Sequence, residues 1–418
     1  MLCCFFNICL GSIKSFIEIS MDIRVKKEDM EDASLFEYKM KRHKQRRVVI
    51  ITLICIVVLS VGFYLLNRFL TKNYNSFEVL DSKAREDNNT AQYISYNSNL
   101  IKYSRDGISA LTPDGKLLWN ASYDVKNPKA VVCEGYVAVA DIGGKQAYSF
   151  DSKGTTYALT TTLPIIDVSI SRQGVLCVTV EGEDYNKVLL YDSNTGVELV
   201  HKQTSVQDNG YPVDVAISND ARKLVCSYVR MEKGVLESNV GFYNFDEVGE
   251  NYEDNLVGVI PDQQIVVHDV VFLNNNTVLM CSDKGFSLYE MLEKPSEILT
   301  KTFDEEIDSL FYTDEYFGFI MKDSENEGTK KLLLYNLKGK NILKKDITMD
   351  YTSVQMSGED IIFNTETEIQ IIESNGNLKF KYTLETPIIS ILPINDKDEF
   401  ILINDQDIVQ IKLVEEKK

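Results

Sequence analysis

The sequence predicts an all-β protein, a β-propeller of eight blades preceded by one transmembrane α-helix. Three observations predict this fold. Short runs rich in Val, Ile, Tyr, Phe and Leu alternate with Asp, Asn and Gly turns through residues 91–418, and helix-period patterns are absent there. One phrase, an apolar strand followed by a polar turn, returns about every 40 to 50 residues, which is the repeat length of a four-stranded blade. Seven blades are the alternative if the first or last unit is partial.

The recurring phrase supplies the third strand of a blade, a hairpin turn and the start of the fourth strand. Turns such as residues 113–116 (PDGK) and 193–196 (SNTG) place Gly where the backbone needs a positive φ, and Asp or Asn where a side chain bonds its own backbone. The eight copies are ISALTPDGKLLW (108–119), AYSFDSKGTTY (147–157), VLLYDSNTGVEL (188–199), VGFYNFDEVGE (240–250), FSLYEMLEKP (286–295), LLLYNLKGKNIL (332–343), IQIIESNGNLKF (369–380) and IVQIKLV (408–414).

Two further strands precede each phrase. One such sheet cannot bury both faces, whereas radial stacking lets each sheet cover its neighbour. The last unit (386–414) has only three strands, and residues 76–81 (SFEVLD) are a candidate for its missing outer strand, which would close the ring. In the third, fourth and fifth units the preceding strands are expected at residues 165–171 and 175–181, 213–218 and 224–229, and 265–273 and 277–283.

The transmembrane helix is expected from Val48 to Leu66, a run of 19 residues without a charge. A helix of that length covers about 28 Å, close to the hydrocarbon thickness of a bilayer. No small-x-small cleavage site follows, which favours an uncleaved anchor over a signal peptide. Only Arg68 and Lys72 follow the run closely, so the positive-inside rule places the N-terminus in the cytoplasm and the propeller outside. The basic residues just before the run are Lys39, Lys41, Arg42, Lys44, Arg46 and Arg47.

These features describe a single-pass protein of the cell membrane with four parts: a cytoplasmic basic tail (1–47), the transmembrane helix (48–66), a polar linker (67–90) and the propeller (91–418). Residues 1–20 are apolar but too short to span a bilayer. Either they form an interfacial segment, or translation starts at Met21 and they are a start-site artefact, which is the interpretation we favour.

The formal net charge of −19 is unevenly distributed. Residues 1–47 carry 10 Lys or Arg against 7 Asp or Glu, and the rest of the chain carries 34 against 56. Such an acidic body repels nucleic acid and anionic headgroups, so no nucleic-acid partner is expected. A basic or neutral partner, or a polyvalent cation, fits better.

Eight Cys are present, and no pair has the close spacing of a zinc or redox motif. Cys177, Cys226 and Cys281 each lie inside an apolar strand-like run, so we expect buried free thiols that pack as small hydrophobic residues. Disulfides are the alternative, although equivalent positions in separate sheets are seldom close enough.

Residues 110–119 (ALTPDGKLLW) and 189–199 (LLYDSNTGVEL) resemble the repeat ends of quinoprotein-like and WD40-like propellers. The layout also resembles an uncharacterised family of Gram-positive bacterial single-pass membrane proteins whose propeller ectodomain is a domain of unknown function. Trp119 is the only Trp, whereas tryptophan-docked quinoprotein repeats carry one in most blades, and the Gly-His and Trp-Asp pairs of WD40 repeats do not recur. The resemblance therefore implies the architecture and no quinone cofactor.

The search for a catalytic site gives a negative result. The three His are His43 beside the membrane segment, His201 at a strand end and His268 at or near an inner strand. Asp269 follows His268, but neighbours on an alternating strand point to opposite faces, so we expect no catalytic pair. Carboxylate pairs such as Glu305-Glu306 are expected on solvated loops of so acidic a chain.

The remaining motifs have ordinary structural explanations. Asp192, Asn194 and Gly196 resemble a calcium loop without its closing Glu, so a hairpin turn is expected. Gly143-Gly144 lacks a Walker pattern and predicts a β-turn. We therefore predict no catalytic, cofactor-binding or metal-ligating residues and no cofactor. Glycosylation sequons, which matter only in a eukaryotic secretory host, occur at Asn88-Asn89-Thr90, Asn120-Ala121-Ser122 and Asn275-Asn276-Thr277.

Three functions fit this pattern. The favoured one is a non-enzymatic module that binds an extracytoplasmic protein or glycan, or acts as a scaffold, at the cell envelope, because propeller faces offer broad loop surfaces and His and metal motifs are scarce. The alternatives are a membrane-tethered hydrolase that uses carboxylates in the central channel, and a sensor that signals through the short N-terminal tail. The hydrolase requires acidic groups that converge with perturbed ionisation.

Overall fold

The computed structural model describes residues 32–70, 73–85, 90–263, 266–324, 326, 328–395 and 398–415. The predictions for residues 1–20, including the start at Met21, and the sequon Asn residues at 88 and 89 lie outside the described residues. The chain divides into two compact units, Met1–Lys72 and Asn73–Lys418, which are described separately.

The first unit contains one described helix, α2 (Asp32–Leu70). Within it, the 23 residues Met40–Gly62 have a mean hydropathy of 1.9 and none of their described side chains is buried, so this helix is long and apolar enough to cross a membrane. Two hydroxyl groups are satisfied within the helix: Thr52 Oγ1 donates to the Val48 carbonyl and Ser60 Oγ to the Ile56 carbonyl, each at 2.8 Å. The helix begins well before the predicted span because the preceding stretch is rich in Lys, Arg and Glu, which are strong helix formers.

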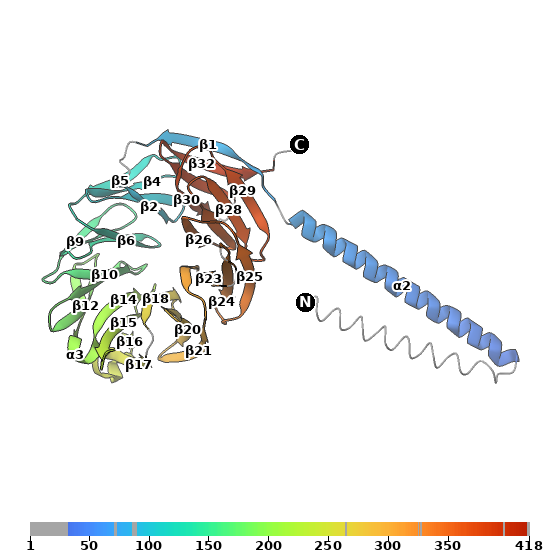
Figure 1. The fold of residues 1–418 in the computed structure, drawn as a ribbon, viewed down its shortest axis with the longest axis horizontal. Coiled ribbons are helices and arrows are strands. Elements are labelled where there is room, and N and C mark those ends of the chain that lie inside the picture. Colours follow the sequence, from blue (N-terminus) through green and yellow to red (C-terminus); the bar gives the residue numbers. More distant parts are fainter. Residues whose placement is uncertain are drawn as a thin grey trace. The chain divides into compact units, whose positions relative to one another are not determined.

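The second unit is a ring of eight four-stranded antiparallel sheets, which confirms the predicted eight-bladed propeller (Figure 1). Within blades 1 to 7 the strands follow in chain order, so the first strand of each is the inner strand and the fourth is the outer strand. Each recurring sequence phrase overlaps the third strand of its blade, as predicted, although β16 (Val235–Asn244) begins five residues before its phrase and β17 (Leu256–Gln263) begins after that phrase ends. Blade 4 also carries the short helices α3 (Val206–Asn209), η1 (Gly249–Asn251) and η2 (Glu253–Asn255).

Blades 1 and 2 comprise β2 (Gln92–Tyr96), β3 (Asn99–Tyr103), β4 (Gly107–Leu111), β5 (Leu117–Ser122), β6 (Pro128–Cys133), β7 (Tyr136–Asp141), β8 (Gln146–Phe150) and β9 (Thr156–Thr160). Blades 3 and 4 comprise β10 (Ile165–Ile170), β11 (Val175–Glu181), β12 (Tyr185–Asp192), β13 (Val197–Ser205), β14 (Tyr211–Ile217), β15 (Lys223–Glu232), β16 (Val235–Asn244) and β17 (Leu256–Gln263). Blades 5 and 6 comprise β18 (Val267–Asn274), β19 (Thr277–Ser282), β20 (Gly285–Met291), β21 (Pro295–Thr302), β22 (Ile307–Tyr312), β23 (Tyr316–Lys322), β24 (Lys330–Asn336) and β25 (Asn341–Ile347). Blades 7 and 8 comprise β26 (Ser353–Ser357), β27 (Asp360–Asn364), β28 (Glu368–Glu373), β29 (Leu378–Thr383), β30 (Ile388–Asn395), β31 (Glu399–Asn404), β32 (Asp407–Val414) and β1 (Ser76–Ala84).

Blade 8 joins the two ends of the propeller. Its strand order is β1-β32-β31-β30, so the predicted closing strand at residues 76–81 supplies the outer strand (Figure 1). The register of the pair runs from Ser76 opposite Val414 to Ala84 opposite Asp407. This pairing leaves the last blade with the same four strands as the others and removes an open edge.

Apolar residues pack between adjacent blades. In β11 the run Val175–Val180 is buried on both faces, since a neighbouring sheet covers each side. Trp119 of blade 1 stacks on Phe150 of blade 2, with ring centroids 5.6 Å apart. It also covers Gly154, whose φ of +82° and close approach to the indole leave no room for a Cβ. The single Trp is therefore an inter-blade packing residue.

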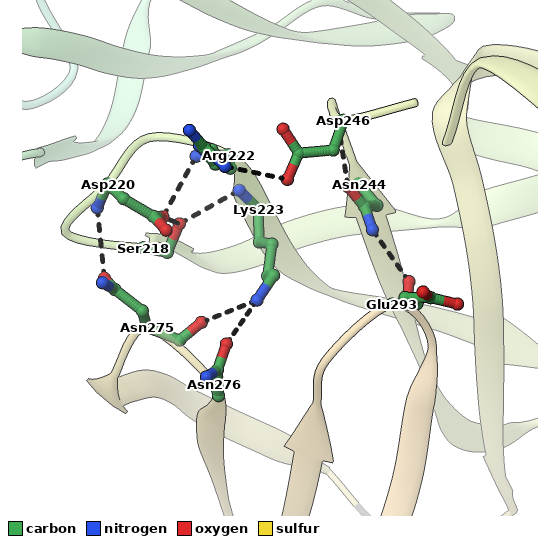
Figure 2. Close-up of polar contacts among 9 residues, drawn as sticks. All are labelled: Ser218, Asp220, Arg222, Lys223, Asn244, Asp246, Asn275, Asn276 and Glu293. Atoms are coloured by element: carbon green, nitrogen blue, oxygen red, sulfur yellow. Dashed lines mark hydrogen bonds and ion pairs between the residues drawn. The ribbon is translucent and has the colours of Figure 1, made fainter. Parts of the chain in front are cut away.

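Polar turns reinforce the seam between blades 4 and 5 (Figure 2). Lys223, only 5% exposed, donates from Nζ to the Asn275 carbonyl at 3.1 Å and to Asn276 Oδ1 at 2.5 Å. The Asp220 amide donates to Asn275 Oδ1 at 3.1 Å, and Asn244 Nδ2 donates to the Glu293 carbonyl at 2.9 Å. These bonds hold together the two blades that carry most of the polar inner-strand residues described below.

Candidate functional site

Acidic residues occupy an equivalent position on the inner strands of three consecutive blades. They are Asp167 on β10, Asp214 on β14 and Asp269 on β18. Each stands directly after a β-bulge, where the register shifts against the second strand of its blade. Such bulges re-aim side chains and are frequent beside functional sites. We therefore treat these three positions and their neighbours as the candidate site.

Asp167 links three blades. Its side chain is buried, and Oδ1 lies 2.5 Å from Nζ of Lys129, on the inner strand of blade 2. Its Oδ2 accepts the amide hydrogen of Val215, on the inner strand of blade 4, at 3.0 Å. A carboxylate that binds an ammonium group and a backbone N–H in this way holds adjacent inner strands in register.

Asp214 repeats this arrangement one blade further on, where Oδ2 accepts the amide hydrogen of Val270 at 2.7 Å. Burial raises the pKa of Asp214 to about 8, and the charge of Asp167 and a hydrogen bond with it add to the rise. These causes favour the protonated form of Asp214. Convergent acids with perturbed ionisation are what a hydrolase requires, but here both carboxyl groups are engaged with backbone N–H groups of the next blade.

His268 and Asp269 form the second part of the site. Nδ1 of His268 lies 2.7 Å from Oδ2 of Asp269, so the expectation that these neighbours point to opposite faces is wrong. The reason is the bulge between Val267 and Asp269, which interrupts the alternation. The hydrogen bond with Asp269, followed by the Cys281 side chain, raises the pKa of His268 to about 10.

Cys281 on β19 lies directly opposite Asp269 in the register of blade 5. Like Cys177 and Cys226, it is completely buried and forms no disulfide, as the sequence predicted. Burial raises the pKa of Cys177 and of Cys226 well above the usual value for a thiol. Cys281 differs from them because a histidine and a carboxylate lie beside it.

The other sequence motifs lie elsewhere. His43 is exposed on α2, and His201 on β13 pairs only with Glu198, at 3.1 Å. Asp192 and Gly196 bound the hairpin turn between β12 and β13, as expected, and both Asp192 oxygens accept hydrogen bonds within that turn. Gly143, with φ of +82°, lies in the predicted turn between β7 and β8.

We expect Asp214→Asn to flatten the dependence of stability on pH. The folded pKa of about 8 exceeds the value of 3.8 for an ordinary Asp, so the wild-type chain loses stability as pH rises through this interval. Asn still accepts the Val270 amide hydrogen but does not ionise. Between pH 5 and pH 9 the stability of the variant relative to wild type should rise by about 4 kcal/mol, seen as a gain of several degrees in melting temperature over wild type at the higher pH. The exposed substitution Asp350→Asn is the control, and identical pH profiles for Asp214→Asn and wild type would contradict the assignment.

Most of the chain matches one known protein family. The profile of a protein family of unknown function, DUF5711, matches residues 70–413. The chain belongs to this family. No curated protein matches the sequence. The match covers the propeller and its closing strand, so DUF5711 corresponds here to a complete eight-bladed ring.

Solved structures share the fold at low sequence identity. BamB from Moraxella catarrhalis superposes with a TM-score of 0.50 and 11% identity, over 81% of this chain and all of BamB. The Pan2 WD40 domain from Neurospora crassa gives 0.45 and 8%, over 82% of this chain and 97% of that domain. Virginiamycin B lyase from Staphylococcus aureus gives 0.42 and 11%, over 81% of this chain and all of the lyase. For the DUF5711 chain the likeness to BamB bears on the propeller fold alone.

Proposed function

We propose that the chain is a membrane-anchored binding module whose propeller recognises a protein partner outside the cytoplasm. The apolar segment Met40–Gly62 supports the anchor, since none of its described side chains is buried. The cluster of Lys and Arg over residues 39–47, just before the uncharged run Val48 to Leu66, supports a cytoplasmic N-terminus. A closed ring supports a binding role because it gives a rigid surface built from many separate turns.

The observation that carries the proposal is a projecting hairpin on blade 4. Its strands β15 and β16 have ten residues each, but the neighbouring strands stop short. On one side the pairing ends at Tyr211 opposite Val229, and on the other at Gln263 opposite Glu237. Residues 230–236, the hairpin tip, therefore extend beyond the rest of the sheet.

The hairpin tip presents three exposed apolar side chains beside the charged residues Arg230, Glu232 and Lys233 of its sequence. Met231 is 70% exposed, Leu236 46% and Val235 40%. Met231 and Leu236 lie opposite each other in the pairing of β15 with β16. Neighbouring exposed apolar side chains at a projecting turn are typical of protein-binding surfaces, whereas a glycan would be held mainly by polar groups and aromatic rings. The tip therefore favours a protein among the two partner classes predicted from the sequence.

Charge complementarity defines the partner further. The chain after residue 47 has 34 basic against 56 acidic residues. A segment that combines apolar side chains with Lys or Arg would match both features.

The test uses intact cells and a membrane-impermeant crosslinker, followed by capture of the full-length chain in mild detergent. We expect a specific protein to be captured by wild type and lost from the double variant Met231→Asp with Leu236→Asp. Val259→Asp, at a 48% exposed position on β17 of the same blade, is the matched control and should retain the partner. Equal capture by the double variant, capture of glycan alone, or capture only with a permeant crosslinker would contradict the proposal.

A further inference from the structure

We infer that His268, Asp269 and Cys281 form a binding site for a zinc ion on the inner strands of blade 5. The possible ligand atoms of these three side chains all lie within 4.8 Å of one another. Bonds of about 2.0–2.3 Å to a tetrahedral ion place neighbouring donors roughly 3–4 Å apart. Small side-chain movements therefore bring the three donors to coordination distance.

The backbone holds the donors in place. The β-bulge puts His268 and Asp269 on the same side of β18, and the pairing with β19 sets Cys281 opposite Asp269. The bond from the Val270 amide to Asp214 of blade 4 fixes the chain immediately after Asp269. A site on paired strands, supported by a neighbouring blade, is more rigid than one on a loop, and rigidity lowers the cost of binding.

The donor types select the ion. A thiolate with an imidazole nitrogen suits zinc and related transition ions, whereas calcium and magnesium prefer oxygen ligands. Three protein donors leave one position of a tetrahedral ion for solvent or another ligand.

The site is accessible from one side. The side chains of His268 and Asp269 are 42% and 48% exposed, whereas Cys281 is completely buried beneath them. An ion can therefore approach past the histidine and the carboxylate and meet the thiol at the inner end. Because the protein shields the Cys281 sulfur from water, we expect a stronger bond between that sulfur and the ion.

Titration of the full-length chain in detergent with zinc, and with cobalt as a spectroscopic substitute, tests the site. We expect one ion per chain and a thiolate-to-cobalt charge-transfer band. His268→Gln and Cys281→Ser should each weaken zinc binding at least about 100-fold, more than the loss of an outer-shell group, and should abolish the band. Calcium and magnesium should not compete.

Two matched controls separate this site from adventitious binding. Cys226→Ser removes an equally buried thiol from blade 4, and His201→Gln removes a histidine that has a carboxylate but no thiol beside it. Both should bind zinc as wild type does. Should Cys281→Ser unfold, as judged by circular dichroism, the exposed His268→Gln and Asp269→Asn decide the question. Absence of the charge-transfer band, or binding unchanged in the His268 variant, would overturn the inference.

Discussion

Replacement of β1 (Ser76–Ala84) by a Gly/Ser segment of equal length is expected to abolish cooperative unfolding of the propeller. The strand pairs with β32 along its whole length, and Phe77 packs against the blade 7–8 core, with its ring 4.9 Å from that of Tyr382. Without it, the edge of β32 is unpaired and the core of blade 8 is open to water. The loss should approach the whole folding free energy of an ordinary domain, about 5–15 kcal/mol.

The measurement is thermal unfolding followed by circular dichroism, with size-exclusion chromatography to detect aggregation. A synthetic peptide of residues 73–85 added in trans should restore part of the transition, since an extended peptide can add to a free sheet edge. A Gly/Ser replacement of the same length at residues 21–29 serves as the control and should melt as wild type does. A wild-type transition in the β1 variant would show that the ring does not depend on this closure.

The ring and its closure could be predicted because their signals are local. Each blade repeats an apolar strand and a turn such as residues 113–116, and the turn residues alone define where one strand ends and the next begins. The closing strand could be predicted from the number of strands in each unit: the unit at 386–414 lacks a fourth strand, and residues 76–81 have the composition of one. The membrane segment has a local signal too, an uncharged run of sufficient length.

The candidate site could not be predicted because it depends on register. Nothing in the sequence around His268 and Asp269 marks a bulge, and without the bulge these residues would lie on opposite faces. Cys281 belongs to another strand and reaches Asp269 only through cross-strand pairing. The contact between Asp167 and the Val215 amide depends further on how adjacent blades are rotated about the ring. A search for metal or catalytic motifs by spacing therefore missed residues that the fold brings together.

A buried lysine at the closing seam gives the second large effect that we expect. Lys379 on β29 is 8% exposed, and its Nζ lies 2.6 Å from Oδ1 of Asp398 and also contacts Asp360. The same Asp398 accepts a hydrogen bond of 2.6 Å from Tyr74, just before β1. Lys379→Met should destabilise the propeller by about 3 kcal/mol at pH 7, because removal of the buried ammonium group leaves two half-buried carboxylates uncompensated.

The pH dependence of this loss identifies its cause. Burial already raises the pKa of Asp360 in the wild-type chain, and loss of the ammonium group should raise it further. A carboxyl group whose pKa is raised in the folded state stabilises the fold most at low pH, and this contribution is lost as pH rises. The difference in unfolding free energy between Lys379→Met and wild type should therefore be smaller at pH 5 than at pH 7. Denaturant unfolding at both pH values measures this difference.

Lys381→Met is the matched control. It removes an exposed lysine of the same strand, which is paired with Glu368 at 3.0 Å, and should lower the unfolding free energy by less than about 1 kcal/mol. Equal losses of unfolding free energy in the two variants would mean that Lys379 stabilises the seam by packing alone. A difference between Lys379→Met and wild type that does not change with pH would mean the same.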